Sequence, residues 1–194
     1  MDHTLLLLGL IKLQAMHGYQ LSDLLERRLK YLTDLKKPTL YHLLAKLEVA
    51  GLIVPRVSRQ GNRPERHTYR LTPAGEREFR QRLQRNLQDA PATYFDDDIG
   101  LLFLSEISVA EARACLAQKR AGVAKRLAEI ERAVAAHQPG TPAYYTLRHH
   151  QLHLQTERAW LDELLAQLGR RLVRQNILDC LSALDEKEKI KQAD

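Results

Sequence analysis

Apolar residues recur at intervals of three and four along the first 50 residues, and glycine or proline separates the runs. This period predicts three helices, over residues 4–14, 19–30 and 38–50. We expect Thr4 to cap the first helix and Pro38 to occupy the first turn of the third, where its missing N–H leaves no bond unmade. The third helix would turn four leucines inward: Leu40, Leu43, Leu44 and Leu47.

The pattern changes after the third helix. Residues 52–71 hold two short stretches of alternating apolar and polar residues around a polar segment, which predicts two strands joined by a loop. Thr72 and Pro73 then have the residue types that begin a helix, which we expect to reach about residue 88. Three helices followed by a hairpin describe a winged helix, a variant of the helix-turn-helix.

The second half begins with a break in the helical pattern. Pro91 and three successive aspartates at 96–98 place a hinge at about 86–98, so we expect domains over residues 1–88 and 89–194. We expect the aspartates to cap a helix amino end rather than to bind a cation.

Two long helices are predicted beyond the hinge. Ser108 and Glu111 form a capping box for a helix to about residue 137, and a second helix covers 143–168. The short connection predicts an antiparallel pair. Residues 170–184 keep a helical pattern, whereas residues 185–194 should fray.

Apolar positions in these two helices have the spacing of a coiled-coil seam, which predicts a dimer interface. The chain is therefore expected to be mainly α, with an N-terminal winged helix and a C-terminal antiparallel helical dimerisation domain. The expected interface residues are Val123, Leu127, Ile130, Leu154, Trp160, Leu161, Leu164 and Leu168.

Positive charge is concentrated in the first half. The net charge is +6, and residues 1–80 hold 14 Lys and Arg against 8 Asp and Glu, whereas residues 81–194 hold 16 of each. Such a concentration is typical of a surface that binds nucleic acid. Cys115 and Cys180 lie too far apart for a zinc finger or a disulfide framework. No run approaches the roughly 18 to 20 apolar residues that cross a bilayer, so we expect a cytoplasmic protein with no membrane partner.

The polar face of the third helix carries donors, acceptors and positive charge. Thr39 and the helix amino end can hold a phosphate, and Tyr41 and His42 can reach base edges or the backbone. Packing in the core is the alternative for Tyr41, and an ordinary solvated hairpin is the alternative for the arginines that follow. The expected contacts to double-stranded operator DNA are Lys36, Lys37, Pro38, Thr39, Tyr41, His42 and Lys46, with Arg56, Arg59, Asn62, Arg63, Arg66 and Arg70 from the hairpin.

Three segments resemble the PadR family of transcriptional regulators: HGYQL at 17–21, PTLYHLLAKLEVAGLI at 38–53 and YRLTPAG at 69–75. FDDDIGLLFLSEIS at 95–108 and the Trp160-Leu161 pair are similar to the dimerisation region of that family. The resemblance implies a homodimer, usually a repressor, that leaves a roughly palindromic operator when a small molecule such as a phenolic acid or a flat aromatic drug binds. It also implies DNA contacts from the wing and from Tyr19, Thr39, Leu40, Tyr41 and His42.

A small aromatic effector would then be a further partner. Trp160 has two interpretations, as a residue of the dimer core or as a stacking surface for such an effector.

Three other functions are alternatives. His149, His153 and Glu157 share one helical face, beside His150, which would suit a metal-responsive regulator. One helix cannot easily supply four ligands, so we expect no metal and no cofactor. A metal-dependent hydrolase is the second alternative, but no nucleophile with its base, phosphate loop or pair of catalytic carboxylates is apparent, so we expect no catalytic residues. The third is a winged helix that binds proteins and shows weak DNA binding without sequence preference.

Overall fold

The computed structural model of the chain describes residues 2–29, 31–58 and 66–168. Its contacts divide the chain into two units, Met1–Ala92 and Thr93–Asp194. The predicted helix over 170–184, the predicted frayed tail and the tip of the predicted wing, with Arg59, Asn62 and Arg63, lie outside the described residues.

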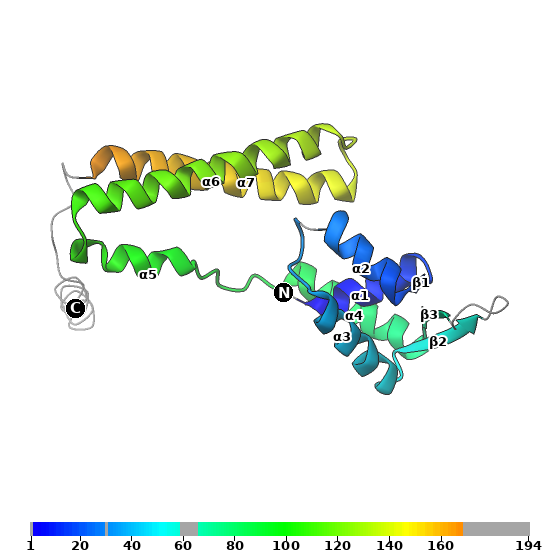
Figure 1. The fold of residues 1–194 in the computed structure, drawn as a ribbon. Helices are drawn as coiled ribbons and strands as arrows, with labels where there is room; N and C mark the ends of the chain where they lie inside the picture. The colour runs from blue at the N-terminus through cyan, green and yellow to red at the C-terminus, as the bar shows by residue number, and fades with distance from the viewer. Residues whose placement is uncertain (1, 30, 59–65, 169–194) are drawn as a thin grey trace, which may run out of the picture. The chain divides into compact units, whose positions relative to one another are not determined.

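The N-terminal unit contains the predicted helices (Figure 1), and the mainly helical winged-helix fold is confirmed. They are α1 (His3–Leu13), α2 (Gly18–Arg27), α3 (Lys37–Val49) and α4 (Pro73–Gln88).

The prediction that Thr4 caps the first helix is wrong. Asp2 is the N-cap, and its carboxylate accepts a hydrogen bond from the Leu5 N–H at 3.0 Å. A carboxylate in this place also gains from the helix dipole, which a threonine hydroxyl does not.

Thr72 caps α4 as predicted, and it also joins α4 to the wing. Its hydroxyl accepts a hydrogen bond from the Gly75 N–H at 3.0 Å and donates to the Gly51 carbonyl at 2.7 Å. Gly75 lies so close to Leu52, the residue before β2, that a Cβ on Gly75 would meet the Leu52 carbonyl oxygen at 2.0 Å. The start of α4 is therefore fixed against the chain between α3 and the first wing strand.

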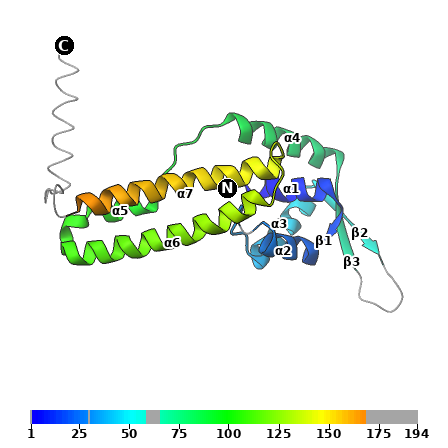
Figure 2. The same cartoon turned by 90° about the horizontal axis from the view of Figure 1, so that it is seen from above.

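A three-stranded antiparallel sheet completes this unit, in the order β1-β3-β2. The two predicted strands are β2 (Ile53–Ser58) and β3 (Arg66–Leu71), and Figure 2 shows them side by side. The third strand, β1 (Met16–His17), was not predicted. Two residues are too few to show an alternating pattern, and β1 exists only because β3 offers it an edge.

The core of the N-terminal unit is built mainly from leucine. Burying one such side chain stabilises the fold by about 1.5 to 3 kcal/mol. The side chains of Leu40, Leu44 and Leu47 point inward as predicted, whereas Leu43 is only partly buried. Among the described residues of this unit, the large side chains that are fully buried are Leu7, Leu8, Leu21, Leu40, Leu44 and Ile53.

The C-terminal unit contains α5 (Asp96–Leu102), a 3-10 turn η1 (Leu104–Glu106), α6 (Val109–Ala135) and α7 (Pro142–Gln167). Figures 1 and 2 both show α6 and α7 side by side and antiparallel, as predicted. The capping box of Ser108 and Glu111 is confirmed, with both of its hydrogen bonds present. Among the described helices, none is both long and apolar enough to cross a membrane.

The expectation that the aspartates cap a helix is corrected at α5. The N-cap of that helix is Phe95, which makes no side-chain capping bond, and the acidic run starts at the first helical residue, Asp96. Negative charge in the first turn still interacts favourably with the helix dipole.

Most of the predicted seam residues are buried within one chain. Val123, Leu127 and Ile130 of α6 are at most 3% exposed. Leu161 and Leu168 are also buried, and Leu154, Trp160 and Leu164 are partly buried in the same cluster. Packing of α6 against α7 accounts for this burial without a second copy.

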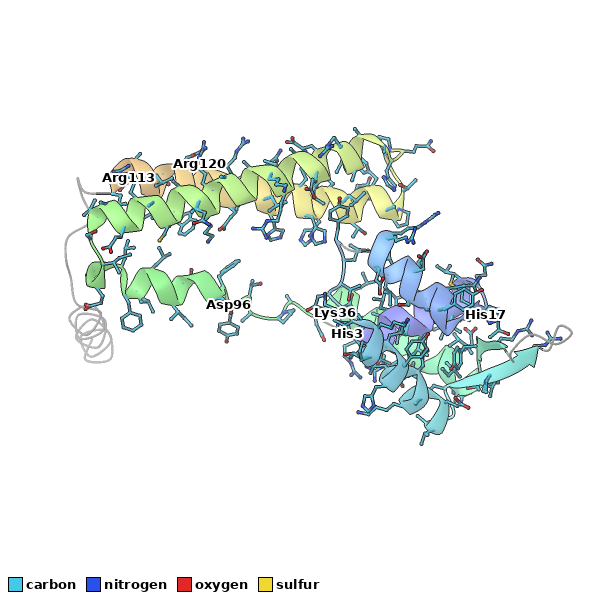
Figure 3. All side chains as sticks on the ribbon, in the orientation of Figure 1. His3, His17, Lys36, Asp96, Arg113 and Arg120 are labelled. Atoms are coloured by element: carbon cyan, nitrogen blue, oxygen red, sulfur yellow. The ribbon has the colours of Figure 1, made fainter. Side chains whose placement is uncertain are left out.

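Polar contacts also join the two long helices. The Arg113 guanidinium of α6 donates to the carbonyls of Leu165 at 3.1 Å and Leu168 at 2.8 Å, so it satisfies backbone groups at the carboxyl end of α7. Arg120 pairs with Asp162, which lowers the pKa of that carboxyl. Arg113 and Arg120 are labelled on α6 in Figure 3.

Candidate nucleic-acid interface

The predicted contact residues of α3 form its exposed face. The side chains of Thr39, Tyr41, His42 and Lys46 are all exposed, because the leucines that alternate with them hold the opposite face in the core. Lys36, Lys37 and Pro38 are exposed at the amino end.

Leu40 is the exception among the expected contacts. Its side chain is 0% exposed and belongs to the core, so it offers no surface to a partner. The spacing of the leucines in α3 predicted that Leu40 is buried, and this is confirmed, whereas the resemblance implied that Leu40 contacts DNA.

The amino end of α3 has no side-chain cap. Its N-cap, Lys36, makes no side-chain capping bond, and proline stands in the first turn. The first backbone N–H to bond within the helix is that of Leu40, which donates to the Lys36 carbonyl at 2.9 Å. The N–H groups of Lys37 and Thr39 precede it, at the positive end of the helix dipole, and the side chains of Lys36 and Lys37 add positive charge there. Lys36 is labelled in Figure 3.

Tyr19 of α2 and Tyr41 of α3 both lie beside the first residue of α2, Gly18. Tyr41 of α3 is 40% exposed, yet its ring lies so close to Gly18 that a Cβ there would meet Tyr41 Cε1 at 2.8 Å. One edge of the Tyr41 ring therefore packs against the start of α2, and the rest of the side chain is exposed to solvent. Tyr19 is 53% exposed, and its ring stacks on His17 with centroids 5.4 Å apart.

Sequence reasoning missed the role of His17, which is labelled in Figure 3. His17 is the N-cap of α2, and its N–H donates to the Gln20 side chain at 2.9 Å in a capping box. The spacing of the two residues was the available signal, since a capping box joins the N-cap to a Glu or Gln three positions later.

Tyr69 of β3 lies beneath this surface. Burial raises the pKa of its phenol, and the nearby Glu48 and Tyr41 raise it further. Tyr69 is therefore a neutral hydrogen-bonding group at physiological pH.

The wing places two arginines on one face. In the register of β2 and β3, Arg56 stands opposite Thr68 and Arg70 stands opposite Val54. Directly paired residues of a ladder share a face, and so do residues two positions apart on one strand, such as Thr68 and Arg70. Arg56 and Arg70 therefore lie on the same side of the hairpin, and both are exposed. Arg66 stands opposite Ser58 in the same register.

The C-terminal unit contains a cavity of about 380 Å³, lined mainly by apolar side chains from α5, η1, α6 and α7. Trp160 forms part of its wall. The Lys119 ammonium lies 5.3 Å from the centroid of the Trp160 ring and 2.8 Å from Glu157 Oε1. The cavity therefore combines an aromatic face, a cation and apolar walls.

The predicted metal face is only partly assembled. His149 Nε2 and His153 Nε2 lie 3.0 Å apart, whereas Glu157 is bound to Lys119. Within the described ranges, no group of three or more His, Cys, Asp or Glu side chains is arranged to hold a metal ion.

Residues 7–81 match the model of the transcriptional regulator PadR-like family. No curated protein sequence matches the chain.

Several solved structures are similar to this one. PadR of Bacillus subtilis in complex with operator DNA is 24% identical, with a TM-score of 0.73 over 87% of this chain and 100% of that chain. PadR of the same organism in complex with p-coumaric acid is 23% identical, with a TM-score of 0.69 over 86% and 95%. The virulence activator AphA of Vibrio cholerae is 20% identical, with a TM-score of 0.67 over 86% and 97%.

These structural similarities show the fold, which extends over both units. The family match covers the helices and the wing of the N-terminal unit, where the three resembling segments lie. The winged-helix domain of this chain thus matches the PadR-like family of transcriptional regulators over residues 7–81.

Proposed function

We propose that this regulator binds double-stranded operator DNA in a sequence-specific manner, as a homodimer, and represses transcription until a small aromatic effector releases it from a roughly palindromic operator. The observation that carries the proposal is the group of exposed polar and basic side chains on the face of α3 opposite its buried leucines, next to an amino end without a side-chain cap.

Each part of the N-terminal unit has a role in this proposal. The amino end of α3, with Lys36 and Lys37, binds a phosphate and fixes the register of the helix on the duplex. His42 and Tyr41 reach base edges in the major groove. Arg56 and Arg70 of the wing neutralise phosphates beside it. Bacillus subtilis PadR, which shares this fold, has been solved in complex with operator DNA, and this supports DNA as the partner.

In this proposal, the two copies of the homodimer contact each other through a surface other than the predicted seam. Because the seam residues of α6 and α7 are covered within one chain, we assign the dimer contact to the apolar side chains that remain exposed at the start of the C-terminal unit. Such a concentration of exposed large apolar residues is typical of a protein interface. They are Tyr94, Phe95, Ile99, Leu102, Phe103 and Ile107.

The cavity beside Trp160 supports an effector site. Its volume of about 380 Å³ suits a molecule with one aromatic ring. The Trp160 ring can stack on such a ligand, and a carboxylate on the ligand would compete with Glu157 for the Lys119 ammonium. Bacillus subtilis PadR has been solved with p-coumaric acid, an aromatic carboxylic acid of this size. An effector of this kind releases DNA by binding the DNA-incompetent arrangement more tightly than the competent one.

Selection of bound fragments from the source genome, followed by anisotropy titration of the full-length protein, tests the function. We expect tight binding to a few fragments that share two half-sites, with affinity falling steeply as salt rises because counterions are released. Equal, weak binding to every fragment would support the protein-interaction alternative. Addition of p-coumaric acid to the complex tests the effector separately.

A further inference from the structure

The two exposed histidines of α7 are placed like the ligands of a metal ion. His149 and His153 stand four positions apart on one face of the helix, with their rings nearly perpendicular at 87° and their centroids 4.5 Å apart. Their Nε2 atoms are 3.0 Å from each other. Two N–H groups cannot point at each other over this distance, so at least one Nε2 presents a lone pair.

The distance between the two nitrogens indicates the class of metal. With metal–nitrogen bonds of about 2.0 to 2.1 Å, two ligands at 90° lie about 2.9 Å apart, whereas two tetrahedral ligands lie about 3.4 Å apart. The observed 3.0 Å is close to the first value. A 90° angle is typical of tetragonal Cu²⁺ and of square-planar or octahedral Ni²⁺, and imidazole is a good ligand for both ions.

We propose that His149 and His153 bind one Cu²⁺ or Ni²⁺ ion through their Nε2 atoms, with water in the remaining positions. The carboxylate that the sequence offered as a third ligand, Glu157, is held by Lys119 at 2.8 Å and is not part of this site. Both histidines are exposed, so the ion and its water have access from solvent.

The third histidine of the cluster, His150, is half-buried, and its ring centroid lies 6.0 Å from that of His149. His150 follows His149 directly in the helix, so it lies off the face that His149 and His153 share and is not a ligand in this proposal.

Binding of Ni²⁺ to the untagged, full-length protein tests the site without any DNA. We expect the wild type to be retained on a Ni²⁺–iminodiacetate resin. We expect His149→Gln and His153→Gln each to weaken Ni²⁺ binding in solution by about tenfold or more. Loss of even an outer-shell partner of a ligand lowers metal affinity by about 10- to 100-fold. His137→Gln, which removes a histidine that lies just after α6, should bind Ni²⁺ like the wild type.

A second variant keeps the number of histidines and changes only their spacing. His153→Gln combined with Thr156→His moves one imidazole to an exposed position almost two turns from His149, where one ion cannot reach both. We expect this variant to bind Ni²⁺ as weakly as His153→Gln, with circular dichroism showing an unchanged helix content. Wild-type binding in either single variant or in the moved-histidine variant would overturn the site. Tighter binding of Zn²⁺ than of Ni²⁺ would overturn the 90° assignment.

Discussion

The absence of a side chain at Gly18 is what allows the Tyr41 ring to lie against the start of α2. A Cβ at position 18 would meet Tyr41 Cε1 at 2.8 Å, which is closer than real Cβ contacts come. The position of Tyr41 on the proposed DNA surface therefore depends on a glycine in another helix.

We expect Gly18→Ala to displace Tyr41 and to weaken operator binding, with a cost in stability of about 1 to 3 kcal/mol from overpacking. Anisotropy titration and thermal unfolding measure the two effects. Gly122→Ala is the matched control, because a Cβ there meets nothing within 4 Å, and it should stabilise α6 by about 0.5 to 1 kcal/mol. Unchanged DNA affinity in Gly18→Ala would remove Tyr41 from the proposed contacts.

Gly75→Ala should have a larger effect on folding than on DNA recognition. Its Cβ would lie 2.0 Å from the Leu52 carbonyl oxygen, a backbone atom that can move only with the wing. We expect a loss of about 3 kcal/mol or more in the free energy of unfolding of the N-terminal unit. Urea unfolding followed by circular dichroism measures it, again beside Gly122→Ala. A loss below about 0.5 kcal/mol would show that the wing shifts freely relative to α4.

Removing a wing arginine should weaken binding to every DNA sequence alike. Arg56→Ala and Arg70→Ala each remove one phosphate contact in our assignment, so the slope of log affinity against log salt should fall by about one for each. Arg126→Ala, an exposed arginine of α6, is the control. Salt titrations of all three check this, and equal slopes in all of them would argue against the wing contacts.

Changing His42 should instead alter sequence preference. If its side chain reaches a base edge, His42→Ala should cost about 1 to 3 kcal/mol on the preferred half-site and less on variants of that half-site. Binding to a set of single-base operator variants measures the difference. A uniform loss across the set would assign His42 to the phosphate backbone.

The proposed dimer surface is tested by a charge at its centre. Ile99 is 63% exposed in one chain, and we expect Ile99→Asp to convert the dimer into a monomer, because a second copy would have to bury the new carboxylate. Leu13→Asp changes an 83% exposed leucine of α1 and should leave the assembly unchanged. Analytical ultracentrifugation distinguishes the outcomes. A dimer that persists in Ile99→Asp would place the interface elsewhere.

The cap of α1 predicts a dependence on pH. Burial alone would raise the pKa of Asp2, but the hydrogen bonds from the Leu5 N–H and the Arg82 guanidinium, with the charge of Arg82, hold it below its ordinary value. Because the folded protein binds this proton less tightly than the unfolded chain, the contribution to stability is complete above about pH 4 and is lost as pH falls through the folded pKa.

Asp2→Asn removes this titration while keeping an N-cap. We expect Asp2→Asn to be less stable than the wild type by about 1 kcal/mol at pH 7, since the charged hydrogen bond to Arg82 is lost, and the difference should shrink below about pH 4. Unfolding by urea at pH 7 and pH 3 gives both values. A difference that stayed constant over this range would mean that the pKa of Asp2 is the same in the folded protein and in the unfolded chain.

Local features of the sequence determined the helices and most of their ends. The leucine period placed Leu40, Leu44 and Leu47 in the core, and Thr72 and Ser108 cap their helices as predicted. These features depend on residues within one or two turns of each other, so the period and the capping residues are enough to predict them.

Tertiary structure alone decided which surfaces are left for partners. The spacing of Val123, Leu127 and Ile130 predicts a seam, but it cannot say whether the opposite helix belongs to the same chain, and α7 of the same chain covers them. In the same way, Glu157 shares a face with His153, yet Lys119 of α6 binds it. Contacts between segments far apart in sequence depend on how whole helices pack, and the local pattern does not contain that information.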